Sequence, residues 1–215
     1  MSDEPITAPP LSKGERTAER LLDAAEALFA HKGYDATALR DIASAADIRQ
    51  PGLYKHFASK DDLYCQVLAR ALQPLADEME ATIDRPASDA SFHQLTGRLI
   101  DVMARHPNVP KLLIRSILSP PSARDEIGME WVNRLADYGR RITRATEHDV
   151  ASADLTLHIV AVFNVMFGFF WAAPLVSGLS GADPTDPDMV ARQKSLLARF
   201  ISSLENATTP TDVQA

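Results

Sequence analysis

The sequence predicts an all-α fold of about nine helices arranged in two domains. Three observations carry this prediction: apolar residues recur with the period of a helix, prolines and capping motifs divide the chain, and no segment is convincing as a strand. The 215 residues suffice for a buried core. A hydrophobic share of 46% with only nine glycines argues against a disordered or fibrous chain.

The first helix is expected to follow a disordered tail at residues 1–11. A capping box formed by Ser12 and Glu15 marks its start, because each side chain can satisfy an amide of the other residue. Its apolar stripe includes Leu21, Leu22 and Phe29, and Gly33 is suited to the left-handed turn that ends it.

Two short helices are predicted next. Thr37 is expected to cap the first of them, and a turn at Asp47 leads into the second, which runs from residue 50 to about 57. Two short helices joined by a tight turn predict a helix-turn-helix, whose second helix can enter the major groove of DNA. This three-helix domain is predicted to occupy residues 12–60.

A second domain is predicted at residues 61–205, followed by a disordered tail at 206–215. Ser59 and Asp62 form another capping box at the start of a long helix, so the boundary lies within this helix or near its start. The expected helices of this region span residues 60–83, 90–105, 109–118, 123–147, 153–176 and 186–205, with a loop at 177–185.

Charge and cysteine content restrict the environment of the chain. The net charge is −7, yet residues 11–60 carry eight Lys/Arg against seven Asp/Glu, so the negative charge lies mostly elsewhere and leaves room for a local basic face. A single cysteine, Cys65, allows no internal disulfide, and residues 1–10 lack the features of a secretion signal. We expect a cytoplasmic protein.

One apolar stretch, residues 159–176, approaches the length of a membrane-spanning helix. No Lys or Arg lies between Arg144 and Arg192 to anchor it at a membrane surface. We therefore expect no membrane contact and interpret the stretch as a helix buried on nearly all sides within an oligomer.

Residues 37–60 read TALRDIASAADIRQPGLYKHFASK, and this segment with its flanks resembles the DNA-binding domain of the TetR family of transcriptional regulators. The resemblance covers about residues 15–72. The positions at the family's spacing are Gly33-Tyr34, Thr37, Asp41-Ile42-Ala43, Leu53-Tyr54, His56-Phe57 and Lys60. Asp47 stands where the family usually has glycine, and Asp tolerates the left-handed region better than most residues.

The polar residues outside the apolar core of this segment suit contacts with phosphates and base edges. The resemblance implies that Thr37, Tyr54 and Lys60 bind phosphates and that Gln50 and Gly52 face bases. The complete expected DNA-binding set is Thr37, Arg40, Arg49, Gln50, Pro51, Gly52, Tyr54, Lys55, His56 and Lys60.

The resemblance also implies a C-terminal domain for ligand binding and dimerisation. Two half-sites on operator DNA require a symmetric homodimer, and helices 153–176 and 186–205 are the expected interface, with Gly168 and Ala172 allowing close approach. The residues expected to line a ligand pocket are Met103, Trp131, Tyr138, Phe163, Asn164, Phe167, Phe170 and Trp171. For each of these residues a place in the ordinary core is the favoured alternative, and for Asn164 the favoured alternative is pairing across the interface.

The expected function is a DNA-binding repressor whose operator affinity responds to a small apolar or aromatic effector. One alternative is a DNA-binding regulator without a ligand, and a weaker one is an all-helical enzyme. The enzyme alternative is weak because the sequence shows no nucleophile–base pair. No catalytic residue, cofactor or metal site is expected.

Overall fold

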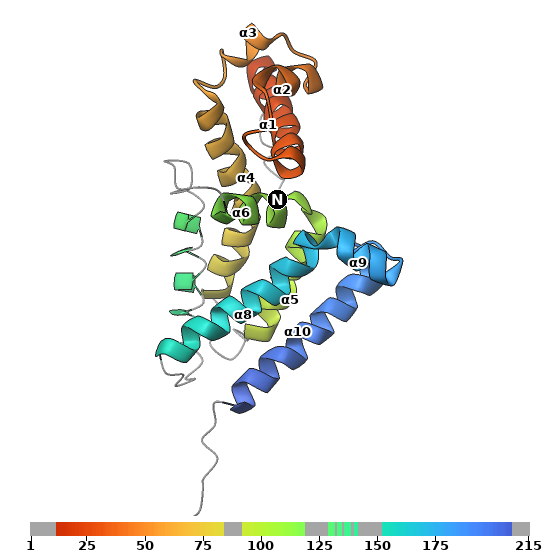
Figure 1. Cartoon of the computed structure of the whole chain (residues 1–215). Helices are drawn as coiled ribbons and strands as arrows, with labels where there is room; N and C mark the ends of the chain where they lie inside the picture. Colours follow the sequence, from red (N-terminus) through yellow and green to blue (C-terminus); the bar gives the residue numbers. More distant parts are fainter. Residues whose placement is uncertain are drawn as a thin grey trace, which may run out of the picture. The chain divides into compact units, whose positions relative to one another are not determined.

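The computed structural model describes residues 12–83, 92–118, 129–131, 133–134, 136–138, 140–141 and 152–207, and the regular elements in these ranges are all helices (Figure 1). The prediction of an all-α fold is confirmed. The helices are α1 (Lys13–Lys32), α2 (Leu39–Ala45), α3 (Gln50–Leu53), α4 (Lys60–Ile83), α5 (Phe92–Arg105), α6 (Asn108–Leu118), α8 (Ser152–Trp171), α9 (Ala173–Ser180) and α10 (Pro187–Ala207).

The chain divides into two compact units, Met1–Val67 and Leu68–Ala215. The division falls inside α4, a few residues after the boundary expected at residue 60. The described residues of the predicted helix 123–147 are helical, and the rest of that helix lies outside the described residues, as do residues 1–11 and 208–215. Residues 206 and 207, expected to belong to the C-terminal tail, are instead part of α10.

Helix α1 begins as its sequence predicts. The amide of Glu15 donates to Oγ of Ser12 at 3.2 Å, and the amide of Ser12 donates to Oε2 of Glu15 at 2.7 Å. Hydrogen bonds to the Glu15 carboxylate, first from the amide and then from the hydroxyl of Ser12, hold the pKa of Glu15 below its usual value. The helix ends at Lys32 and is capped by Gly33, whose φ of 84° is positive but whose ψ of 170° lies outside the left-handed helical region.

The region between α2 and α3 differs from the prediction in two places. Ala38, not Thr37, is the N-cap of α2, and no side chain caps this helix. Helix α3 ends at Leu53, earlier than the expected residue 57, because the amides of Lys55 and His56 donate to carbonyls three residues back and close turns instead of α-helical hydrogen bonds. The turn before α3 contains Asp47 at a φ of 54°.

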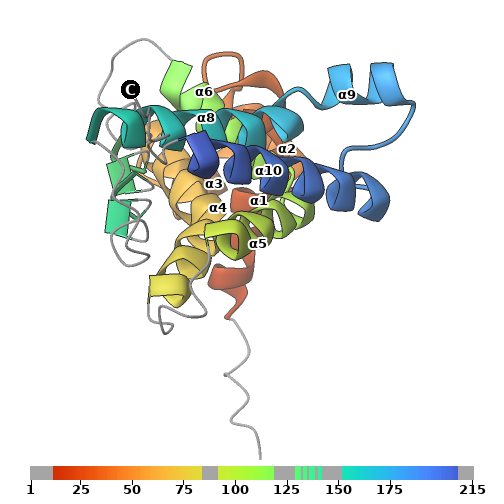
Figure 2. The same cartoon turned by 90° about the horizontal axis from the view of Figure 1, so that it is seen from below.

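In the C-terminal unit, α5, α8 and α10 lie side by side (Figures 1 and 2). Their buried faces include Leu99 of α5, Phe167 of α8 and Leu197 of α10, each less than 5% exposed. Between α8 and α10, the amide nitrogen of Gln193 donates to the carbonyl of Val165 at 2.8 Å. These contacts join α5, α8 and α10 in one shared core.

The prediction of one continuous helix over residues 153–176 is wrong. Helix α8 ends at Trp171, and α9 leaves it at an angle of 70°. Pro174 lies in the first turn of α9 and has no amide hydrogen to continue the hydrogen bonding of α8. Helix α9 then ends at Ser180 and is capped by Gly181, with a φ of 70°, so the loop before α10 begins later than the expected residue 177.

Within the described ranges, no individual helix combines the length and the hydropathy required to cross a bilayer. The segments Thr156–Trp171 and Ala173–Ser180 reach that threshold only when joined across their 70° bend.

Candidate nucleic-acid interface

The expected DNA-contacting side chains are mostly on the surface of the N-terminal unit. Those of Arg40, Arg49, Gln50, Pro51, Tyr54 and Lys55 are exposed, whereas Gly52, His56 and Lys60 are half-buried. Arg40, Arg49 and Gln50 line one surface hollow together with Ala43, Ser44, Asp47 and Ile48. The structure thus brings two cations and one amide from separate helices to a single polar depression.

The packing beneath this surface fixes α3 against α2. Leu53 and Ile42 are fully buried, and the amide of Ile48 donates to the carbonyl of Ala43 at 2.8 Å across the turn. Gly52 approaches Ile48 so closely that a Cβ at position 52 would lie 2.9 Å from Cγ2 of Ile48. The glycine is therefore required by the close approach of α3 to the preceding turn.

Arg20 supports the same turn from α1, which the sequence reasoning missed. Its guanidinium donates a hydrogen bond to the carbonyl of Ala46 and lies 3.8 Å from Oδ2 of Asp47. The carbonyl at the end of α2 thereby gains a partner that α2 does not supply. No local pattern identifies this contact, because 26 residues separate its two ends.

Lys60 lies at the first position of α4, beside a cluster of aromatic rings. Its Nζ is 4.0 Å from the centroid of the Tyr34 ring, and the Tyr34 hydroxyl donates to Oδ1 of Asp61 at 2.8 Å. The Tyr34 ring in turn packs against Phe29 and Tyr64. The ammonium group keeps its positive charge over the aromatic face, and this contact restricts the motion of the lysine side chain.

The capping box predicted at the start of α4 forms in part. The amide of Asp62 donates to Oγ of Ser59 at 3.0 Å, as expected. The carboxylate of Asp62 accepts from the amide of Ala58 at 2.8 Å, one residue before the predicted donor.

Burial, followed by the charges of Asp61 and Asp62, raises the pKa of the Cys65 thiol, which disfavours the reactive thiolate.

Thr37 does not fit the phosphate-binding role that the resemblance implies. Its side chain is 1% exposed, and its hydroxyl donates to the carbonyl of Gly33 at 2.7 Å, with the carbonyl of Leu28 at 3.4 Å. The hydroxyl thus closes the end of α1 from inside the domain. The expectation of a hydroxyl–phosphate contact is corrected on this ground.

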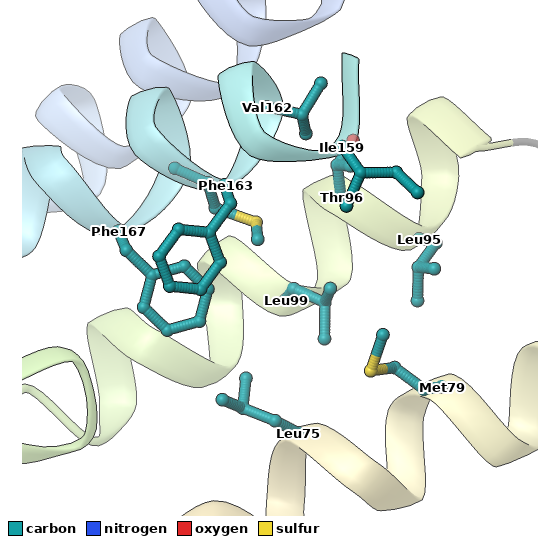
Figure 3. A pocket seen from close by; sticks show the side chains of 10 residues that line it. Leu75, Met79, Leu95, Thr96, Leu99, Ile159, Val162, Phe163 and Phe167 are labelled. Carbon is teal, nitrogen blue, oxygen red and sulfur yellow. The ribbon is translucent and has the colours of Figure 1, made fainter. Parts of the chain in front are cut away.

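The C-terminal unit contains a cavity between α4, α5 and α8 (Figure 3). It is lined by Leu75, Met79, Leu95, Thr96, Leu99, Ile159, Val162, Phe163, Met166 and Phe167. Of the eight residues expected to line a pocket, Phe163 and Phe167 do so. Met103, Trp131, Tyr138 and Phe170 are buried outside this lining, and Asn164 and Trp171 are exposed.

Tyr138 is one of the residues placed elsewhere. Its hydroxyl donates to Oε1 of Glu80 at 2.6 Å, and this hydrogen bond, with burial, raises the pKa of the phenol. Among the described residues, no cluster of three His, Cys, Asp or Glu side chains could hold a metal ion.

Three helices with a polar surface on a short third helix define the class of helix-turn-helix proteins. Residues 21–67 match the sequence model described as bacterial regulatory proteins, tetR family. The N-terminal unit is therefore similar to the DNA-binding region of this family of transcriptional regulators.

Two relatives are similar to part of the sequence. An HTH-type transcriptional repressor of Mycobacterium tuberculosis is 34% identical over 109 residues, which are 46% of this chain and 58% of the repressor. The HTH-type transcriptional repressor KstR2 of Rhodococcus jostii is 43% identical over 75 residues, 33% of this chain and 36% of that protein. The matched parts thus cover less than two thirds of these relatives.

The structural similarity covers more of the chain than the sequence similarity does. A TetR-family transcriptional regulator from Bordetella parapertussis superposes with a TM-score of 0.67 at 16% sequence identity. The superposition covers 85% of this chain and 94% of the other. Both units therefore have counterparts in the fold of that regulator.

Proposed function

We propose that this protein is a dimeric transcriptional repressor that binds operator DNA through α3 and the residues around it. The single observation that carries the proposal is the exposed polar surface formed by Arg40, Arg49, Gln50, Tyr54 and Lys55 over a tightly packed turn. It combines cations for phosphates with hydrogen-bonding groups for base edges, which is the division of labour that sequence-specific binding requires.

Within this surface, Gln50 is the residue suited to reading bases, because its amide can pair bidentately with adenine. Tyr54, with its side chain 53% exposed, and Lys60 are suited to phosphates. Thr37 is left out of the proposed contacts because its hydroxyl is buried.

The dimer is proposed to form through α8 and α10, with α9 extending the interface. Large apolar side chains are exposed on these helices: Leu157, Val160, Trp171, Leu175, Leu179 and Leu196. Helix α9 has no buried residue of its own. A Cβ at Gly168 would meet nothing within 4 Å, which leaves space for close helix approach, and exposed Asn164 is available to pair with its counterpart.

A small apolar effector is proposed to bind the cavity of the C-terminal unit. Helix α4 carries Lys60 at its start and contributes Leu75 and Met79 to the cavity lining. A ligand that binds one orientation of α4 better than another shifts the equilibrium between the two orientations. Operator affinity then changes with the population of the orientation that binds DNA.

The DNA-binding part is tested by mobility shift with the DNA upstream of the protein's own gene at several salt concentrations. Tyr54→Ala and Lys60→Ala should weaken binding to all sequences, and Lys60→Ala should reduce the salt slope by about 1. Gln50→Ala should relax discrimination at one base pair by about 1–3 kcal/mol. Arg105→Ala, which removes an exposed cation of α5, is the control and should leave binding unchanged.

Unchanged affinity of Tyr54→Ala would refute the assigned recognition surface, and absence of any shift at low salt would refute DNA binding.

The effector is tested by thermal shift against a library of metabolites and drugs. A uniform absence of shifts would favour the second candidate function, a DNA-binding regulator without a ligand, which the small volume of the cavity, about 50 Å³, supports.

A further inference from the structure

The cavity of the C-terminal unit selects its occupant by chemistry and by shape. We infer that it takes one unbranched alkyl chain, with any polar end of the ligand at an opening beside Ile159 and Phe163. This inference rests on the proposed function of this unit as a ligand-binding unit, and it narrows the class of effector from apolar molecules in general to straight-chain aliphatic ones.

The lining offers almost no polar group to a ligand. Nine of its ten residues are apolar, and the exception, Thr96, already donates its hydroxyl proton to the carbonyl of His93 at 3.0 Å. Two thioethers, from Met79 and Met166, add polarizable and adaptable surface. A charged or strongly polar group inside this cavity would lose its hydration without gaining a partner.

The charged groups on the neighbouring turns of α4 and α5 are paired outside the cavity. Arg98 lies 3.1 Å from Oε2 of Glu78 and also donates to the hydroxyl of Thr82 at 2.7 Å. Glu80 accepts the hydroxyl proton of Tyr138. None of these five residues belongs to the lining, so they give a buried ligand neither a counter-ion nor a hydrogen bond.

The shape favours a chain over a ring. The lining follows α8 from Ile159 to Phe167, a rise of about 12 Å at about 1.5 Å per residue. A small cavity volume, about 50 Å³, along a lining of this length favours a slender methylene chain, whose carbons keep about 4 Å from neighbouring atoms, over a wider cyclohexyl group.

The opening lies on the α8 side of the cavity. Ile159 and Phe163 are half-buried, whereas the other eight lining residues are buried. The two are four residues apart and so lie on one face of α8 (Figure 3). Phe163 stacks on Phe167 at a centroid distance of 4.3 Å, which continues the wall inward from the opening.

The test is calorimetric titration of the purified full chain with straight-chain alcohols from 1-butanol to 1-decanol. Affinity should rise about four-fold per added methylene, which corresponds to about 0.8 kcal/mol, and then level off when the channel is full. Cyclohexylmethanol should bind at least ten-fold more weakly than 1-heptanol, which has the same number of carbons. Affinity independent of chain length, or equal affinity for these two alcohols, would overturn the inference.

Variants locate the binding. Leu99→Phe fills the cavity from inside, and Ile159→Trp blocks the half-buried opening, where a larger side chain disturbs folding least. Each should lower 1-heptanol affinity at least ten-fold, and Leu118→Trp, at an exposed position of α6, should not change it. Thr96→Val should leave affinity unchanged, and a ten-fold loss in this variant would overturn the inference by showing a hydrogen-bonded ligand.

Mobility shifts with and without 1-heptanol separate this inference from the proposed function. Chain-length-dependent binding that leaves operator affinity unchanged would support the ligand class and reject its coupling to DNA. Operator binding by a protein that binds no alcohol of any length would overturn the inference and leave the DNA-binding proposal standing.

Discussion

Replacing Thr37 by valine separates a structural hydroxyl from a DNA-binding one. Valine keeps the shape of the side chain but removes the donor to the carbonyls of Gly33 and Leu28. Because position 37 is 1% exposed, water does not replace the lost hydrogen bond, and the unfolding free energy should fall by about 1–3 kcal/mol. Operator affinity should stay within two-fold at temperatures where the variant remains folded.

Urea denaturation followed by circular dichroism gives the stability change, and mobility shift gives the affinity. Thr17→Val is the matched control, because Thr17 donates to the carbonyl of Lys13 at 2.9 Å in an exposed position, where water compensates the loss. Its stability should change by less than about 0.5 kcal/mol. Unchanged stability of Thr37→Val together with a large loss of operator affinity would refute the structural role.

Two further predictions concern the turn before α3 and the C-terminal unit. Gly52→Ala should destabilise the protein by about 1–3 kcal/mol and weaken operator binding, because the new Cβ would lie 2.9 Å from Cγ2 of Ile48. Gly97→Ala, which has open space around its Cβ, should instead stabilise α5 by about 0.5–1 kcal/mol. Urea denaturation measures both changes. Since Tyr138 has a raised pKa, its bond to Glu80 should stabilise the fold fully below about pH 10 and lose that effect as pH rises through the folded-state pKa. Absorbance titration at 295 nm should show one tyrosine ionising late, and Tyr138→Phe should abolish that late step.

Local sequence signals predict those structural features, such as helix starts, that depend on residues close together in the chain. The capping box of Ser12 and Glu15 was predicted because both partners lie within one turn. Hydropathy alone does not predict the break between α8 and α9, because Pro174 lies within an apolar stretch, and it is the missing amide hydrogen of this proline that interrupts the helix.

The candidate sites show the same difference. The polar surface around α3 follows from short-range spacing, so its exposed members could be identified, whereas the burial of Thr37 depends on how the end of α1 folds back over it. The cavity lining combines three helices from distant parts of the chain. Leu75, Leu95 and Leu99 carry no signal that distinguishes a cavity wall from ordinary core.

The ring of Tyr34 beneath the ammonium group of Lys60 has an entropic consequence for association. Immobilising a long side chain at an interface costs about 0.5–1.5 kcal/mol. Here part of that conformational freedom is already lost in the unbound protein, since the aromatic face and the Tyr34–Asp61 hydrogen bond restrain the lysine and its support. The side chain is thus preorganised, and a phosphate meeting it gains a positive charge at a reduced ordering cost.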